Sequence, residues 1–162
     1  MDDIFIRVDN RLVHGQILEG WIPFIKASRI VVVNDEVAGD IYRETVIRMA
    51  IPSDIEVLVY GVDEFAGEFS HVRNNRKRTI ILLGDVDDLL RAYRAGFHFD
   101  YVNIGNIHCD NGMVSCSPSI SLSKDDIQRI MHLVSEGVKV ELRCMPRDKP
   151  LDAREVIEKL KD

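Results

Sequence analysis

The chain is poor in cysteine and has no long apolar run. Three cysteines, Cys109, Cys116 and Cys144, occur in 162 residues, which is not the even set of a disulfide framework and favours a reducing compartment. No apolar run reaches the length of a membrane-spanning helix. The start, MDDIFIR, is acidic and lacks the apolar stretch of a signal peptide. These absences predict a soluble, cytoplasmic protein.

Positive charge is also scarce. The 21 Lys and Arg residues are outnumbered by 27 Asp and Glu residues, and the net charge is −6, whereas a nucleic-acid binder usually presents a basic face. The one basic cluster, HVRNNRKR at residues 71–78, has no interleaved aromatic residue. We interpret it as a solvated connection, with a docking patch for an acidic partner as the alternative. We therefore expect no nucleic acid as a partner.

The signatures of nucleotide and metal sites are missing too. No G-x-G-x-x-G and no P-loop follows any predicted strand. A receiver domain would need clustered aspartates after its first strand to hold magnesium, but only Asp9 stands there. His108, Cys109 and Cys116 lie close in sequence, but their spacing matches no standard zinc site, and ordinary thiols are the simpler interpretation. We expect no cofactor and no metal.

What the sequence does contain is a regular alternation of strand and helix patterns. Apolar stripes predict helices over residues 86–93, 127–134 and about 152–160, and Asp85 and Ser123 are the predicted caps of the first two. Runs rich in β-branched residues predict strands at residues 4–8, 29–34, 56–60, 79–83, 101–104 and 139–144. The alternation predicts one domain over residues 1–162, of the α/β class, with an open, mostly parallel twisted sheet and helices on both faces.

In such sheets ligands bind beyond the carboxyl ends of the strands, where the strand order reverses. Of the segments that follow predicted strands, only DNRLVHGQI, residues 9–17, contains a strong nucleophile. His14 lies in this segment, and Gly15 directly after it is expected to open a helix. Free N–H groups at a helix start favour an anion.

The residues around His14 suit phosphoryl chemistry. A neutral imidazole could attack a phosphoryl group and hold it as phosphohistidine. Arg11 offers a fixed positive charge, Gly15 permits unusual dihedral angles and a close approach of phosphate, and Gln16 offers a hydrogen-bond donor. Asp9 either pairs with Arg11 or holds the ring tautomer, and the sequence does not decide between these. A solvated surface loop without chemistry fits the same composition.

The sequence also leaves open the role of one pair of aromatic residues. Trp21 and Phe24 fall on the helix expected after Gly15, with a proline between them. They are either core residues or an exposed docking face near His14.

Several segments together resemble a known family. They are RVDNRLVHGQ, Trp21, RIVVVNDEVAGD, MAIPSDIEV, VNIGNIH and GVKVELRCMPRDKP, in order over nearly the whole chain. They resemble the enzyme IIB component of the mannose/fructose/sorbose family of the bacterial phosphotransferase system.

The resemblance implies an open, mainly parallel α/β sheet. It also implies that a phosphorylated IIA domain phosphorylates His14 at Nδ1, beside the loop arginine Arg11. The phosphoryl group would then pass to a sugar that enters through membrane IIC and IID partners, with no metal or nucleotide. The protein would act in the cytoplasm, peripheral to that transporter.

The chain departs from the family pattern at two places. Asp9-Asn10 replaces an acidic pair before the loop arginine, and Gly105-Asn106 replaces a Gly-Gly or Gly-small pair. A diverged, non-catalytic or regulatory module that keeps the fold and an anion-binding loop is therefore an alternative. A generic α/β small-molecule binder is another. The sugar and the oligomeric state, including a possible homo-oligomer, stay open.

Overall fold

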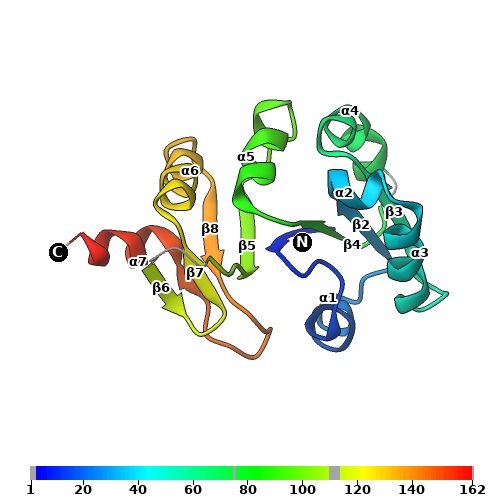
Figure 1. Ribbon diagram of the computed structural model, residues 1–162, viewed down its shortest axis with the longest axis horizontal. Coiled ribbons are helices and arrows are strands. Elements are labelled where there is room, and N and C mark those ends of the chain that lie inside the picture. The colour runs from blue at the N-terminus through cyan, green and yellow to red at the C-terminus, as the bar shows by residue number, and fades with distance from the viewer. Residues whose placement is uncertain (1–2, 75, 110–113, 162) are drawn as a thin grey trace.

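The computed structural model describes residues 3–74, 76–109 and 114–161. Within these residues a seven-stranded sheet has the order β3-β2-β4-β1-β5-β8-β9 (Figure 1). The strands are β1 (Ile4–Asp9), β2 (Arg29–Val33), β3 (Glu56–Tyr60), β4 (Thr79–Leu83), β5 (Tyr101–Asn106), β8 (Lys139–Leu142) and β9 (Leu151–Asp152). Neighbouring strands pair in parallel except β9, which is antiparallel to β8. A separate antiparallel pair joins β6 (Val114–Ser117) to β7 (Ile120–Leu122).

Helices cover both faces of the sheet, as the sequence predicts. A π-helical segment η1 (Gln16–Trp21) continues into α1 (Ile22–Ile25), and the other helices are α2 (Asp35–Ala38), α3 (Ile41–Ala50), α4 (Val62–Arg73), α5 (Val86–Arg94), α6 (Lys124–Ser135) and α7 (Ala153–Leu160). The residues of β2 alternate between two apolar cores. Val31 and Val33 join a core with α4, α5, α6 and α7, whereas Ile30 and Val32 join one with η1, α1 and α2. Figure 1 shows α5 and α1 on opposite sides of the sheet.

The predicted caps of two helices are confirmed. The Asp85 carboxylate accepts a hydrogen bond from the backbone N–H of Asp88. Ser123 and Asp126 form a reciprocal capping box at the start of α6. No described helix is long and apolar enough to cross a membrane.

Several element boundaries differ from those expected from the sequence. Strand β1 ends at Asp9, one position past the predicted end, and β8 ends at Leu142, two positions before it. The strand predicted at 29–34 ends at Val33, because the Asn34 side chain caps α2 by accepting from the Val37 N–H. Helix α4 extends to Arg73 and buries Val72. The basic cluster at residues 71–78, which was interpreted as a connection, therefore begins within the last turn of this helix. Residue 75 of the cluster lies outside the described residues. Strand β5 runs to Asn106, two positions past the predicted end.

The longer β5 reflects a bulge in its pairing with β1. Arg7 pairs with Asn103 and Val8 with Ile104, but Asp9 pairs with Asn106, so Gly105 is an extra residue. A bulge of this kind re-aims the side chains next to it. It lies at the carboxyl end of the central strand, where the site is found.

Candidate functional site

The loop after β1 lies at a switch point of the sheet. Strand β1 sits between β4 and β5. The helix after β1 packs in one apolar core, and α5, which follows β4, packs in the other. Neighbouring strands whose connections leave on opposite faces open a crevice at their carboxyl ends. The predicted segment 9–17 therefore lies where an α/β sheet binds its ligands.

Asp9 is the centre of the polar contacts at this crevice. Its Oδ2 accepts hydrogen bonds from His14 Nε2 at 2.8 Å, from Asn106 Nδ2 at 2.9 Å and from Arg7 Nη2 at 3.1 Å. Its Oδ1 accepts the backbone N–H of Arg11 at 3.0 Å. The sequence left open whether Asp9 pairs with Arg11 or holds the tautomer of His14. The structure shows its carboxylate against the histidine ring. Its ionic partner is Arg7, and Arg11 reaches it through the backbone.

These contacts set the charge of Asp9. Burial alone would raise the pKa of this carboxyl group. The hydrogen bonds from His14 and Asn106 and the charge of Arg7 outweigh burial and hold the pKa below its ordinary value. Asp9 is therefore ionised at neutral pH and can only accept hydrogen bonds.

An ionised Asp9 fixes the tautomer of His14. Because Oδ2 cannot donate, Nε2 of the ring must carry the proton of the 2.8 Å hydrogen bond. In the neutral ring the lone pair then stays on Nδ1. The His14 side chain is 8% exposed, so it is sheltered but reachable. A ring held in this way leaves Nδ1 with the lone pair that a nucleophile needs.

The start of the helix differs in detail from the prediction. Gly15 has φ −51° and ψ −40°, an ordinary right-handed conformation, so the expectation of unusual dihedral angles there is wrong. The left-handed residue of this loop is Leu12, with φ 56°. A Cβ on Gly15 would meet nothing within 4 Å, so the space beside its backbone is open. The N–H groups of Ile17 and Leu18 both bond to the His14 carbonyl, and the amides of Gly15 and Gln16 precede this first helical hydrogen bond.

Gln16 is oriented by its neighbours. Its Oε1 accepts from Asn106 Nδ2 at 2.6 Å and from Cys144 Sγ at 3.4 Å. Since the oxygen is engaged, the amide nitrogen of Gln16 is the end left to donate to a ligand. Asn106 connects Gln16 to Asp9, because its Nδ2 donates a hydrogen bond to each of them. From the sequence, Asn106 was noted only as a departure from the Gly-Gly or Gly-small pair of the family.

Arg11 lies apart from this network. It is exposed and borders a groove of about 320 Å³ that is also lined by Leu12, Val37, Tyr42, Arg43, Val46 and Ile47. In the described part of the chain, Arg11 joins the network only through its backbone N–H to Asp9. The loop thus brings together Asp9, His14 and Gln16 and leaves the Arg11 guanidinium on the surface.

Arg7 is a site residue that was not predicted from the sequence. This side chain is fully buried in β1 and its guanidinium contacts Asp9. The signal was an arginine in the otherwise apolar strand predicted at residues 4–8, IFIRV. A charge buried in a sheet is almost always paired, so this arginine predicts a partner.

The two aromatic residues of the first helix have separate roles. Trp21 is buried, stacks on Phe5 at a centroid distance of 4.7 Å and donates its indole N–H to the Cys144 carbonyl. Phe24 is 60% exposed. Trp21 is therefore a core residue, and only Phe24 is on the surface.

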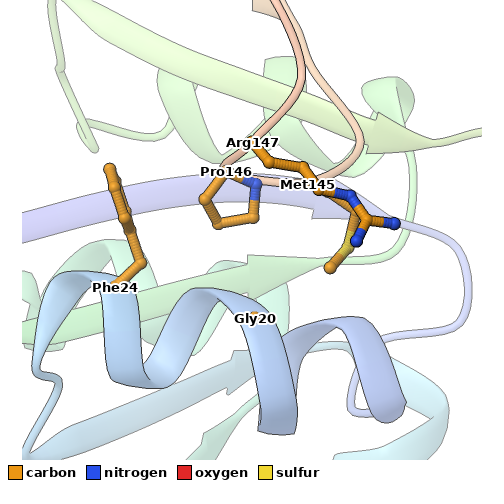
Figure 2. A pocket seen from close by; sticks show the side chains of 5 residues that line it. All are labelled: Gly20, Phe24, Met145, Pro146 and Arg147. Carbon is orange, nitrogen blue, oxygen red and sulfur yellow. The ribbon is translucent and has the colours of Figure 1, made fainter.

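Phe24 borders a second groove, of about 350 Å³, on this helix. Figure 2 shows Gly20 and Phe24 on the helix and Met145, Pro146 and Arg147 on the loop after β8. None of the residues that contact Asp9 or His14 lines this groove. Among the described residues, no three His, Cys, Asp or Glu side chains gather as a possible metal site.

Comparisons with known proteins point to one family. The model of the sorbose subfamily IIB component of phosphotransferase (PTS) systems matches residues 4–162. The chain is 32% identical over 157 residues to the fructose-specific EIIB component of Bacillus subtilis (strain 168), covering 97% of this chain and 96% of that protein. It is 28% identical over 154 residues to the mannose-specific EIIAB component of Escherichia coli (strain K12), covering 95% of this chain and 48% of that protein. The crystal structure of the IIBSor domain of the sorbose permease from Klebsiella pneumoniae matches with a TM-score of 0.86 and 29% identity, over 96% of each chain.

Proposed function

This chain belongs to the sorbose subfamily of the IIB components of phosphotransferase systems, and we propose that it carries the phosphoryl group on His14. As a IIB component it is a phosphotransferase of sugar uptake. The observation that carries the proposal is the 2.8 Å hydrogen bond between His14 Nε2 and the ionised Asp9. It leaves Nδ1 as the nucleophilic nitrogen, which is the atom that the family resemblance implies.

The transfer follows from this ring geometry. The Nδ1 lone pair attacks the phosphorus of a phosphorylated donor, the N–P bond forms, and the bond between phosphorus and the donor breaks. The ring, which keeps its proton on Nε2, gains a positive charge as this bond forms. Asp9 lies against that proton and offsets the charge. In the second transfer a sugar hydroxyl attacks the phosphorus, its proton is released to solvent, and the electron pair of the N–P bond returns to Nδ1.

We assign the phosphoryl oxygens to the groups around His14. The free amide nitrogen of Gln16 and the backbone amides of Gly15 and Gln16 are uncharged donors at the helix start. Arg11 is the mobile charge, since its exposed side chain is free to follow the phosphoryl group in either transfer. No metal or nucleotide is needed for either step.

The donor that we propose is a phosphorylated IIA domain, and the acceptor route runs through membrane IIC and IID components. The mannose-specific relative of E. coli is named an EIIAB component, which supports this kind of donor. We propose that residues 1–162 act as one IIB domain at the cytoplasmic face of that transporter. The family match over residues 4–162 supports a single unit.

A docking face for the donor adjoins the loop. Helix α3 buries none of its residues, and its Tyr42 and Met49 are each 81% exposed. Tyr42 and Val46 line the same groove as Arg11. A partner that reaches His14 would cover this groove, so we propose that the IIA donor packs on α3 while Arg11 approaches its phosphoryl group.

Intact-mass spectrometry tests the phosphoryl acceptor directly. The chain is incubated with a IIA domain that has been phosphorylated beforehand, beside His14→Ala as the matched control. We expect one acid-labile phosphoryl group on the wild type and none on the variant. A ³¹P NMR spectrum of the product should then show the Nδ1 isomer of phosphohistidine. Phosphorylation of His14→Ala, or phosphorylation of the wild type at Nε2, would contradict the proposal.

A further inference from the structure

We propose that Arg7 and Gly105 are positioning residues for His14: the Arg7 guanidinium, which lies against the Cα of Gly105, holds Asp9 in the place where it accepts the hydrogen bond from Nε2–H of the ring. The inference about the ring stands on the geometry alone. Its consequence for phosphorylation rests on the proposed function. Neither residue touches the reacting atoms, and each acts through Asp9.

The contacts of Arg7 explain why an arginine is needed. Its side chain is fully buried, and burying a cation is costly unless each donor is matched. Nε and Nη2 donate to Asp9 Oδ2 at 3.3 and 3.1 Å, and Nη1 donates to Asn103 Oδ1 at 2.7 Å and to the Arg143 carbonyl at 3.0 Å. The rigid fork therefore reaches Asp9 on one side and β5 and the end of β8 on the other. A lysine concentrates its donors on one nitrogen and cannot span both sides.

Gly105 makes the space for this fork. It is the extra residue of the bulge between β1 and β5, and it has no positive φ that would call for glycine. A Cβ built on Gly105 would overlap Cζ and both terminal nitrogens of Arg7. Any side chain at this position must therefore displace the guanidinium and, with it, Asp9. Space, and not backbone conformation, requires the glycine.

The other contacts keep the guanidinium from moving elsewhere. Asn103 Nδ2 donates to Glu141 Oε2 at 3.0 Å, and Tyr101 donates its hydroxyl proton to the same carboxylate. Burial and this hydrogen bond raise the pKa of Tyr101, so it stays protonated and remains a donor. The Trp21 ring packs against another side of the Arg7 guanidinium, and its centroid lies 5.2 Å from Arg7 Cζ. Arg7 is thus fixed between the sheet and the first helix.

The hold on Asp9 matters because three side chains share one of its oxygens. Asp9 Oδ2 accepts from Arg7, Asn106 and His14. If the guanidinium leaves, the carboxylate loses its cationic partner and one of the groups that fix its rotation. The His14 ring then no longer has a fixed acceptor at Nε2. Both the tautomer and the direction of Nδ1 become less defined.

NMR of the ring, paired with phosphorylation kinetics, tests this positioning. The variants are Gly105→Ala and Arg7→Lys. The controls are Gly67→Ala, where a Cβ meets open space in α4, and Arg29→Lys, which alters another buried strand arginine that bonds Thr79 and not Asp9. A hydrogen-bonded Nε2–H of His14 gives a downfield, slowly exchanging proton signal. We expect both test variants to lose this signal and both controls to keep it.

The kinetic readout is phosphorylation by a phosphorylated IIA domain. We expect Gly105→Ala and Arg7→Lys to be roughly 10- to 100-fold slower, as for other small misplacements of a reacting group, with more Nε2-phosphorylated product by ³¹P NMR. If folded test variants keep the wild-type Nε2–H signal and rate, the proposal is wrong. If Gly105→Ala does not fold, Asn103→Ser, which removes one acceptor of Arg7, takes its place. If even the wild type is not phosphorylated, the proposed function fails, and the Nε2–H signals still decide whether Arg7 positions the ring.

Discussion

Replacement of Asp9 by asparagine is expected to weaken both the fold and the phosphoryl transfer. Both carboxylate oxygens accept hydrogen bonds: Oδ1 from the Arg11 N–H, and Oδ2 from His14, Arg7 and Asn106. An amide has only one oxygen. Whichever way it is turned, its NH₂ group faces donors, and Arg7 is left buried without an ionic partner.

The size of the effect follows from these lost contacts. Removing one partner of a buried ion pair costs about 3–5 kcal/mol of unfolding free energy. The ring also loses the anion that offsets its charge during transfer, which we expect to slow phosphorylation roughly a hundredfold. The two effects are separable, because urea denaturation reports the first and the initial rate of mass gain reports the second.

The pH dependence provides the sharper test. The folded pKa of Asp9 lies below its ordinary value, which is about 3.9 in unfolded chains. The stability that Asp9 contributes is therefore present above about pH 4 and is lost as pH falls through the lower folded pKa. The difference in unfolding free energy between wild type and Asp9→Asn should then be largest near neutral pH and shrink on acidification. A difference below about 0.5 kcal/mol at neutral pH, within the range of ordinary surface substitutions, would refute the reasoning.

Three further predictions concern the surface around His14. Arg11→Ala should slow phosphorylation roughly 10- to 100-fold, the worth of one hydrogen bond to a charged group, while Tm stays unchanged because the side chain is exposed; a wild-type rate would remove Arg11 from the transfer. Gln16→Glu keeps the acceptor for Asn106 but presents an anion where the amide donated, so the rate should fall roughly a hundredfold, and an unchanged rate would argue against this donor. Tyr42→Asp on α3 should raise the KM for the phosphorylated IIA donor with little change in kcat or Tm, because Tyr42 lines the groove and is 81% exposed. The matched control is Leu160→Asp on α7, which is also exposed but lies outside the groove, and equal KM values for the two would contradict docking on α3.

The architecture was predictable because local patterns carry it. In β2 and in β4 the last four residues are apolar and buried, which is typical of parallel strands covered on both faces. The caps at Asp85 and Ser123 were equally local, since each side chain bonds an amide three residues away. The end of β2 was missed although its signal is equally local: Asn34 accepts from the amide of Val37, three residues on, but was read as the last residue of the preceding apolar run.

The site was only half predictable for a related reason. His14, Asp9 and Gln16 lie within one short segment, and the contact between His14 and Asp9 follows from the turn. Arg7 was missed although Asp9 is only two residues away, because its burial and its contact with Asn103 depend on β5, almost a hundred residues further along the chain. The bulge that places Asn106 beside Asp9 depends on pairing between strands, which no local pattern shows. Unusual dihedral angles were expected at Gly15, but Gly15 is right-handed and the left-handed residue of the loop is Leu12.

The buried pair of Arg7 and Asp9 is better explained by orientation than by stability. Two buried charges contribute little net stability, and apolar residues of similar volume often replace such pairs without loss. Apolar residues, however, could not accept a hydrogen bond from Nε2–H of His14. They therefore could not fix the tautomer that leaves the lone pair on Nδ1. The large loss of stability expected for Asp9→Asn therefore measures an unpaired Arg7 rather than the worth of the pair. Its slower phosphorylation measures what the pair does for the ring, and this is why both quantities must be followed in the same variant.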